Sequence, residues 1–131
     1  LFAGEERNTK RAKVLLCIAL AILTVMAVKD ILAVARPCAG LADCPKDHSF
    51  PSLHAVVAFA LMTAFLDKKA FSVYLLFALF VCFTRLNLGV HTFRDISGAL
   101  AIALISYYVI DRIWPMIEPA AKRVFRGVAD G

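Results

Sequence analysis

Two histidines and one aspartate stand at the edges of apolar segments, where their side chains can take part in acid–base and nucleophilic chemistry. His91 and Asp95 are four residues apart, so on a helix they share a face and the carboxylate can orient the imidazole. An imidazole held in this way can attack as a nucleophile. His54 lies just before another apolar run, and a second histidine can give a proton to a leaving oxygen. The three residues predict a group-transfer site.

Basic residues at the same segment ends indicate which group is transferred: Lys29, Arg36 and Arg85. The run Pro51-Ser52-Leu53-His54 has a proline at a helix start. This places Ser52 and His54 at a helix N-terminus, whose free N–H groups attract anions. Cations and a helix N-terminus together bind phosphate. Because the cations can stabilise phosphoryl oxygens themselves, we predict a phosphate site that requires no metal and no cofactor.

Four stretches without charged residues must position these groups: Val14–Val28, Phe50–Leu66, Ala70–Thr84 and Ile96–Ile110. Each is near or just under the ~20 residues that span a bilayer. Hydrophobic residues make up 61% of the 131-residue chain, above the roughly 45–50% of a soluble domain, and so short a soluble chain could not bury them all. We therefore prefer an all-α, polytopic transmembrane bundle of four spans to the alternative, a soluble helical core.

The basic residues predict how the bundle lies in the membrane. Ten of the 15 Lys and Arg residues lie in the N-terminal segment, between the second and third stretches, or after the fourth. The positive-inside rule places these regions, with both termini, in the cytoplasm of what we expect to be a prokaryotic cell. The candidate site then faces away from the cytoplasm. A net charge of +5 does not indicate nucleic acid here, because the basic residues bracket apolar runs instead of forming one polar face.

The order and spacing of the polar residues resemble the three-part signature of the type 2 phosphatidic acid phosphatase superfamily: Lys29-x6-Arg36-Pro37, Pro51-Ser52-Leu53-His54 and Arg85-x5-His91-x3-Asp95. The resemblance implies one membrane-embedded domain over residues 1–131. Its membrane members usually have six helices, so the four spans would match the last four, and we expect helices upstream of this chain. The implied substrate is a membrane lipid phosphate, while the oligomeric state stays open.

The resemblance also implies a role for each matched residue. His91 is similar to the nucleophile that forms a phosphohistidine, Asp95 to its orienting partner and His54 to the general acid. The remaining matched residues are similar to the ligands of the substrate phosphate, with backbone N–H groups near Leu53 assisting: Lys29, Arg36, Ser52, Leu53 and Arg85. Water would then release phosphate from the histidine.

Two departures from the family pattern leave alternatives open. Leu53 stands where the family usually has glycine, and Thr84 where it often has serine. Leucine at this position is also similar to a branch that transfers phospho-head groups between lipids. Besides a phosphatase of lipid phosphomonoesters or polyprenyl diphosphates, we therefore consider a head-group phosphotransferase and a catalytically silent lipid-binding protein.

Cysteines and one acidic residue complete the candidate set. Cys38 and Cys44 lie in the same loop, and an oxidising compartment would let them form a disulfide. Whether they pair stays open. Cys17 and Cys82 lie inside spans, where cysteine acts as a small apolar residue. Asp30 has no role in the resemblance, and we expect a local ion pair with Lys29 or Arg36.

Overall fold

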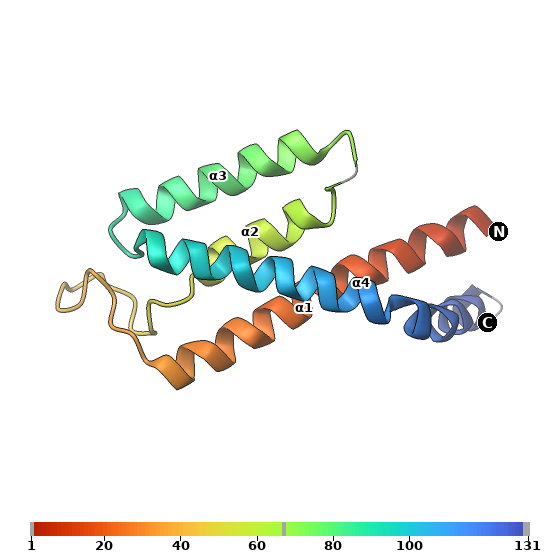
Figure 1. Cartoon of the computed structure of the whole chain (residues 1–131), viewed down its shortest axis with the longest axis horizontal. Helices are drawn as coiled ribbons and strands as arrows, with labels where there is room; N and C mark the ends of the chain where they lie inside the picture. The colour runs from red at the N-terminus through yellow and green to blue at the C-terminus, as the bar shows by residue number, and fades with distance from the viewer. Residues whose placement is uncertain (1, 67, 130–131) are drawn as a thin grey trace.

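The computed structural model describes residues 2–66 and 68–129, and over these ranges the chain is all-helical, without strands. Its four helices follow one another in a bundle: α1 (Phe2–Leu32), α2 (Leu53–Thr63), α3 (Phe71–Asn87) and α4 (Phe93–Ala129). Both termini lie at one end of the bundle (Figure 1). The long connection between α1 and α2 and the short turn between α3 and α4 lie at the other end (Figure 1). The all-α prediction is confirmed.

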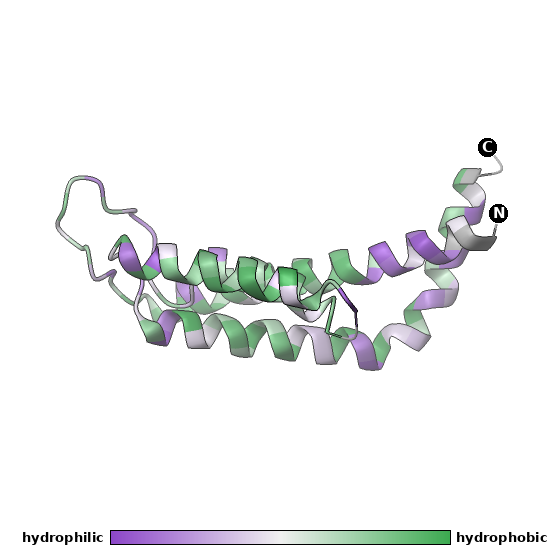
Figure 2. Ribbon diagram, turned by 90° about the horizontal axis from the view of Figure 1, so that it is seen from above, coloured by the Kyte–Doolittle hydropathy of each residue, from purple (hydrophilic) through white to green (hydrophobic). Residues whose placement is uncertain are grey.

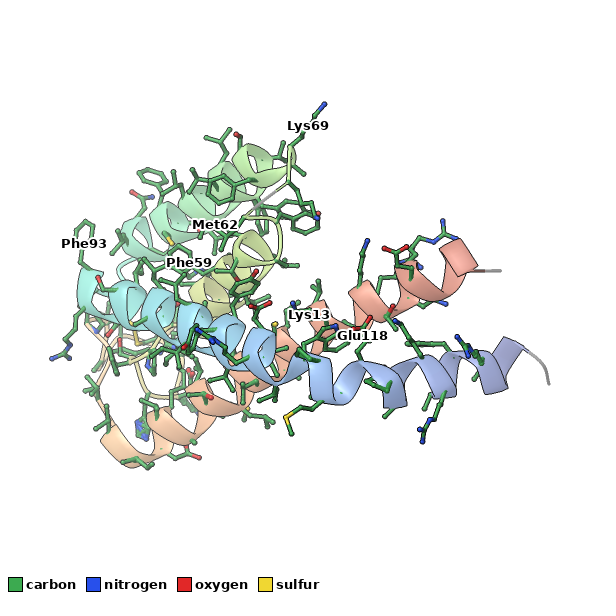
Figure 3. The ribbon with its side chains drawn as sticks, turned by 45° about the vertical axis from the view of Figure 1, so that its right-hand side comes forward. Lys13, Phe59, Met62, Lys69, Phe93 and Glu118 are labelled. Atoms are coloured by element: carbon green, nitrogen blue, oxygen red, sulfur yellow. A yellow bond between two sulfur atoms is a disulfide. The ribbon has the colours of Figure 1, made fainter. Side chains whose placement is uncertain are left out.

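Helix α2 is the centre of the packing, because it contacts each of the other three helices, while α1 also packs along α4. Small side chains fill many buried positions, among them Ala21, Ala55 and Ala99, and they let the helix backbones approach closely. Phe59 and Met62 of α2 are buried inside the bundle, whereas Phe93 and Lys69 point away from it (Figure 3). Helix α3 packs mainly on α2 and forms the outer edge of the bundle.

The distribution of apolar residues suggests a membrane environment. Hydrophobic residues fill the middle of the bundle and hydrophilic ones gather towards its ends (Figure 2). Helices α1 and α4 are long and apolar enough to cross a bilayer, yet only 22% and 28% of their most apolar stretches are buried. The core helix of a soluble protein is mostly buried instead. Large side chains of α3 such as Phe80 and Phe83 are likewise exposed, at 65% and 63%, and a patch of this kind marks an interaction surface.

The lengths of the two inner helices differ from the expected spans. Helix α2 has 11 residues and α3 has 17, so both are shorter than α1 and α4. Helix α2 is shorter at both ends than the expected span Phe50–Leu66, because Ser52 is its N-cap and Ala64 is its C-cap. Pro51 therefore precedes the N-cap. We had expected it in the first helical turn.

Two helices extend beyond the apolar stretches of the sequence. Helix α1 continues past Val28 and ends at Leu32, before Arg36-Pro37, because Ala33 takes a positive φ of 46°, which a helix cannot continue. Helix α4 continues past Ile110 and through Pro115 and Pro119 to Ala129. Proline in a helix removes a hydrogen bond and clashes with the preceding turn, which commonly kinks a helix without ending it. The ribbon of α4 changes direction in this part (Figure 1).

Candidate active site

The three motifs meet at the end of the bundle opposite the termini. Lys29 is in the last turn of α1 and Arg85 in the last turn of α3. His54 is in the first turn of α2, and Asp95 is in the first turn of α4. Successive helices run in opposite directions (Figure 1), so the end of one helix and the start of the next lie at the same end.

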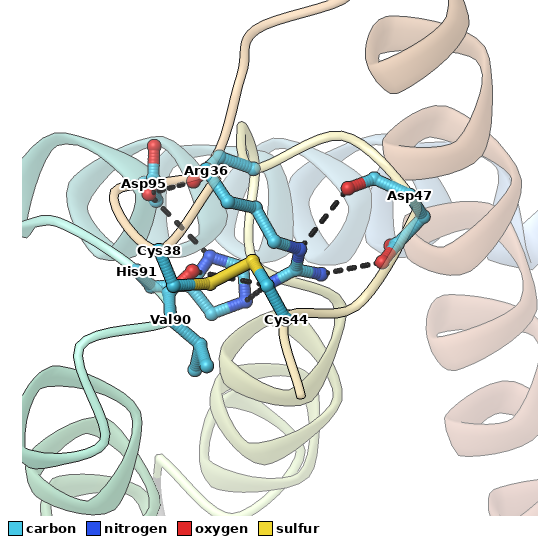
Figure 4. Close-up of a disulfide and its surroundings, with 8 residues drawn as sticks. Arg36, Cys38, Cys44, Asp47, Val90, His91 and Asp95 are labelled. Carbon is cyan, nitrogen blue, oxygen red and sulfur yellow. Dashed lines mark hydrogen bonds and ion pairs between the residues drawn. A yellow bond between two sulfur atoms is a disulfide. The ribbon is translucent and has the colours of Figure 1, made fainter. Parts of the chain in front are cut away.

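Arg36 contacts His91 directly. Its Nη1 atom lies 3.1 Å from His91 Nε2 and donates to the carbonyl oxygen of Val90 at 3.0 Å (Figure 4). A guanidinium has only donors, so Nε2 must accept, and the ring proton belongs on Nδ1. Burial and the Arg36 charge, followed by a smaller contribution from Lys29, lower the pKa of His91 below its usual value despite the opposing effect of Asp95. The ring is therefore neutral, and its unprotonated Nε2 is the nitrogen that can attack once it gives up the hydrogen bond from Arg36.

Asp95 lies behind the other ring nitrogen. Its Oδ2 atom is 3.4 Å from His91 Nδ1, and both side chains are buried. The same oxygen accepts hydrogen bonds from Ser49 Oγ at 2.5 Å and from the Thr92 N–H at 2.7 Å. The Nδ1–Oδ2 contact has ion-pair distance without hydrogen-bond geometry, and catalytic hydrogen bonds often tighten only when substrate binds. Because α4 begins at Phe93, His91 precedes the helix, yet the expected pair still forms.

Lys29 and Arg36 share one carboxylate, that of Asp47. Lys29 Nζ lies 2.8 Å from its Oδ2 and Arg36 Nη2 lies 2.7 Å from its Oδ1. Partial burial of Asp47 raises its pKa, but hydrogen bonds and charges from the two cations outweigh this and lower it to about 2. Sequence reasoning missed Asp47 and assigned this pairing to Asp30, which is exposed. No periodicity or motif marks Asp47, because it lies in an irregular loop.

His54 and Arg85 lie on the open side of the site. His54 is exposed and within electrostatic range of Arg85 and Arg36. Arg85 is half-buried, and its Nε atom has no hydrogen-bond partner within the described part of the chain. A pocket of about 340 Å³ begins at His54 and continues between α2 and α3, lined otherwise by apolar side chains: Leu53, Val57, Ala58, Leu61, Phe77 and Val81.

Ser52 and Leu53 form the N-terminus of α2. The Ser52 side chain is fully buried and caps the helix by accepting from the Ala55 N–H at 3.4 Å, and its own N–H donates to the Asp95 carbonyl at 3.2 Å. Leu53 is the first helical residue, so it needs no positive φ, which glycine alone adopts freely. A phosphate contact by Ser52 stays a prediction.

The loop between α1 and α2 carries a disulfide. Cys38 and Cys44 are bonded, with their Cα atoms 5.6 Å apart (Figure 4), and this cross-link lies beside Arg36 in the same loop. Cys17 and Cys82 are buried free thiols inside α1 and α3. Within residues 2–66 and 68–129, no group of three His, Cys, Asp or Glu residues could hold a metal ion.

Comparison with known proteins gives one match. The family model of the PAP2 superfamily matches residues 11–118, a range that includes every candidate site residue. The searches of curated proteins and of solved structures gave no match. Since the family match covers most of the 131 residues, the chain belongs to the PAP2 superfamily.

Proposed function

We propose that this protein hydrolyses a lipid phosphomonoester or a polyprenyl diphosphate through a phosphohistidine on His91. Membership of the PAP2 superfamily supports a phosphatase in general. The observation that carries the finer proposal is the contact of Arg36 Nη1 with His91 Nε2 at 3.1 Å. This contact places the unprotonated nitrogen of a neutral imidazole beside a cation that can bind a phosphoryl oxygen.

The first step forms a bond from His91 Nε2 to phosphorus as the bond from phosphorus to the leaving oxygen breaks. His54 gives its proton to that oxygen, while the carboxylate of Asp95 stabilises the imidazolium that develops. Lys29, Arg36 and Arg85 would neutralise the phosphoryl oxygens, and positioning by fixed charges accounts for most catalysis of phosphoryl transfer.

The second step returns the enzyme to its starting state. Neutral His54 takes a proton from water, the resulting hydroxide attacks phosphorus, and the bond to His91 breaks. Inorganic phosphate leaves and His54 is again protonated. The protons balance within the site, so the steps need only water as co-reactant.

A lipid substrate fits the surroundings of the site. The large apolar side chains on the outer surface of α3 are exposed, and the pocket beside His54 is almost entirely apolar. An acyl or prenyl chain in that pocket would hold its phosphate at the bundle end. We propose that this end faces away from the cytoplasm, because the basic residues concentrate at the other end.

Transfer to an alcohol is the second candidate. Leu53, at the family's glycine position, lines the apolar pocket together with His54, so an apolar alcohol could reach the phosphohistidine in place of water. The two reactions differ in product: hydrolysis releases inorganic phosphate, whereas transfer gives a lipid with a new head group.

The test uses His91→Ala in detergent-solubilised protein. Phosphate release should be followed over phosphatidic acid, phosphatidylglycerol phosphate and polyprenyl diphosphate, with EDTA present. We expect the variant to lose at least about 10³-fold in kcat, as nucleophile replacements do, and to form no acid-labile phosphoenzyme. His48→Ala is the matched control, because it removes a histidine at the same end of the bundle, in the α1–α2 loop, whose side chain makes no contact with His91 in the site described above. Retained turnover in a folded His91→Ala protein would overturn the assignment.

A further inference from the structure

The carboxylate of Asp47 covers the two cations that are the best candidates to bind phosphate. The Lys29 and Arg36 side chains are only 8% and 7% exposed, whereas that of Asp47 is 57% exposed. Asp47 therefore lies on the solvent side, with one oxygen on each cation. We call Lys29 and Arg36 together the phosphate seat. An incoming phosphoryl group needs the same donor atoms, so it must compete with this carboxylate.

Backbone contacts hold the loop on the phosphate seat independently of the carboxylate. Arg36 Nε donates to the Asp47 carbonyl oxygen at 3.0 Å, and Lys29 Nζ donates to the His48 carbonyl oxygen. The Cys38–Cys44 disulfide restrains the preceding part of the same loop. Rotation of the Asp47 side chain alone would therefore free one donor on each cation without moving the loop backbone.

The charges of the site also favour this exchange. The phosphoryl group of a phosphomonoester carries a charge of about −1.5 to −2 at neutral pH, whereas the Asp47 carboxylate carries a single negative charge. The phosphoryl group therefore attracts Lys29 and Arg36 more strongly than the carboxylate does. While Asp47 stays on the phosphate seat, the two anions repel each other.

We propose that Asp47 closes the phosphate seat in the absence of substrate, and that the substrate's phosphoryl group replaces its carboxylate on Lys29 and Arg36. This inference rests on the proposed function, since it concerns the same site. It makes Asp47 a positioning residue, which keeps the two cations aligned while the seat holds no substrate. Phosphate binding is weakened by the free energy needed to break the ion pairs of Asp47 with these cations.

Asp47→Asn tests the proposal, because it removes the charge and keeps the shape. Orthovanadate, a phosphate-shaped anion, would be titrated into wild-type and variant protein in detergent by isothermal calorimetry. We expect Kd to fall about tenfold in the variant, equivalent to ~1.4 kcal/mol, and KM for a lipid phosphate to fall with it. Asp43→Asn removes the same charge from an exposed position in the same loop, and its Kd should stay within about twofold of wild type.

Each other result contradicts the proposal. Unchanged or weaker vanadate binding in Asp47→Asn means that Asp47 only supports the loop, and an equal gain in Asp43→Asn means a general effect of charge. Asp47→Ser is the second variant should the asparagine protein fail to fold. Because calorimetry needs no turnover, a protein that binds vanadate as expected but hydrolyses no lipid would sink the proposed function alone. A lipid phosphatase without the gain in binding would sink only the inference about Asp47.

Discussion

Arg36 connects the parts of the site through one planar group. Its guanidinium reaches the Asp47 carboxylate, the Val90 carbonyl and the His91 ring at once. A lysine would offer a point charge on a flexible stem and could not hold this fixed fork of donors. The side chain thereby fixes the tautomer of His91 and supplies positive charge beside the proposed attacking atom.

Asp95→Asn should separate orientation of His91 from binding of phosphate. The amide cannot stabilise an imidazolium, and its NH2 group can turn towards Nδ1, so kcat should fall about 10²- to 10⁴-fold. Asp95 contacts no cation of the phosphate seat in the hydrogen bonds described above, so KM should change less than about threefold. Separate measurement of kcat and KM on one lipid phosphate checks the prediction.

Ser49, which donates a hydrogen bond to the Asp95 carboxylate, offers a milder variant for comparison. Ser49→Ala keeps the carboxylate and removes one of its donors, so it should reduce kcat only about tenfold and cost ~1–3 kcal/mol of stability for a less satisfied buried carboxylate. A kcat for Asp95→Asn within about fivefold of wild type would contradict the orienting role.

The helix ends explain why residues far apart in the chain form one site. Lys29 and Arg85 end two helices, and His54 and Asp95 begin the two that run in the opposite direction. Alternating helix directions alone place all four at one end of the bundle (Figure 1). Helix α3 has a second role, because one face closes the pocket beside His54 and the rest of its surface carries exposed apolar side chains.

Val57→Trp should show whether the pocket between α2 and α3 holds the lipid chain. The larger side chain fills the pocket, so kcat/KM should fall at least about tenfold for a long-chain lipid phosphate. Even one misplaced methylene in an apolar pocket commonly lowers kcat/KM by about this factor. For p-nitrophenyl phosphate, which has no such chain, it should change less than about twofold. The ratio of the two values is the readout.

The matched control for this variant lies on the same pair of helices. Leu76 of α3 is 68% exposed and does not line the pocket, so Leu76→Trp places the same large side chain on the outer surface. It should leave the ratio near the wild-type value. Equal losses on both substrates in Val57→Trp would indicate a packing defect at His54 and contradict a chain-binding pocket.

Much of the molecule could be predicted from its sequence, because helices and their ends leave local signals. Apolar runs and the spacing of His91 and Asp95 indicated four helices and their shared end. The contributions of Ser49 and Asp47 could not be found in this way, since both lie in an irregular loop whose path depends on long-range contacts such as the bond of the Ser49 N–H to Val34. Nor do local signals indicate that α4 continues past Pro115, because proline usually breaks a helix and here the surrounding helix tolerates it.

The charges of the whole bundle predict its orientation in the membrane, which is the subject of the last prediction. Basic residues concentrate at the end that carries both termini, and this end should stay in the cytoplasm. Green fluorescent protein fused after Gly131 should therefore fluoresce in membranes of a bacterial host, whereas secreted alkaline phosphatase fused there should be inactive. Replacing Lys122, Arg123 and Arg126 by glutamine should weaken this preference, because only positive charges near the ends of spans count strongly. An active alkaline phosphatase fusion would place the catalytic end in the cytoplasm and contradict the proposed orientation, while leaving the chemistry of His91 unaffected.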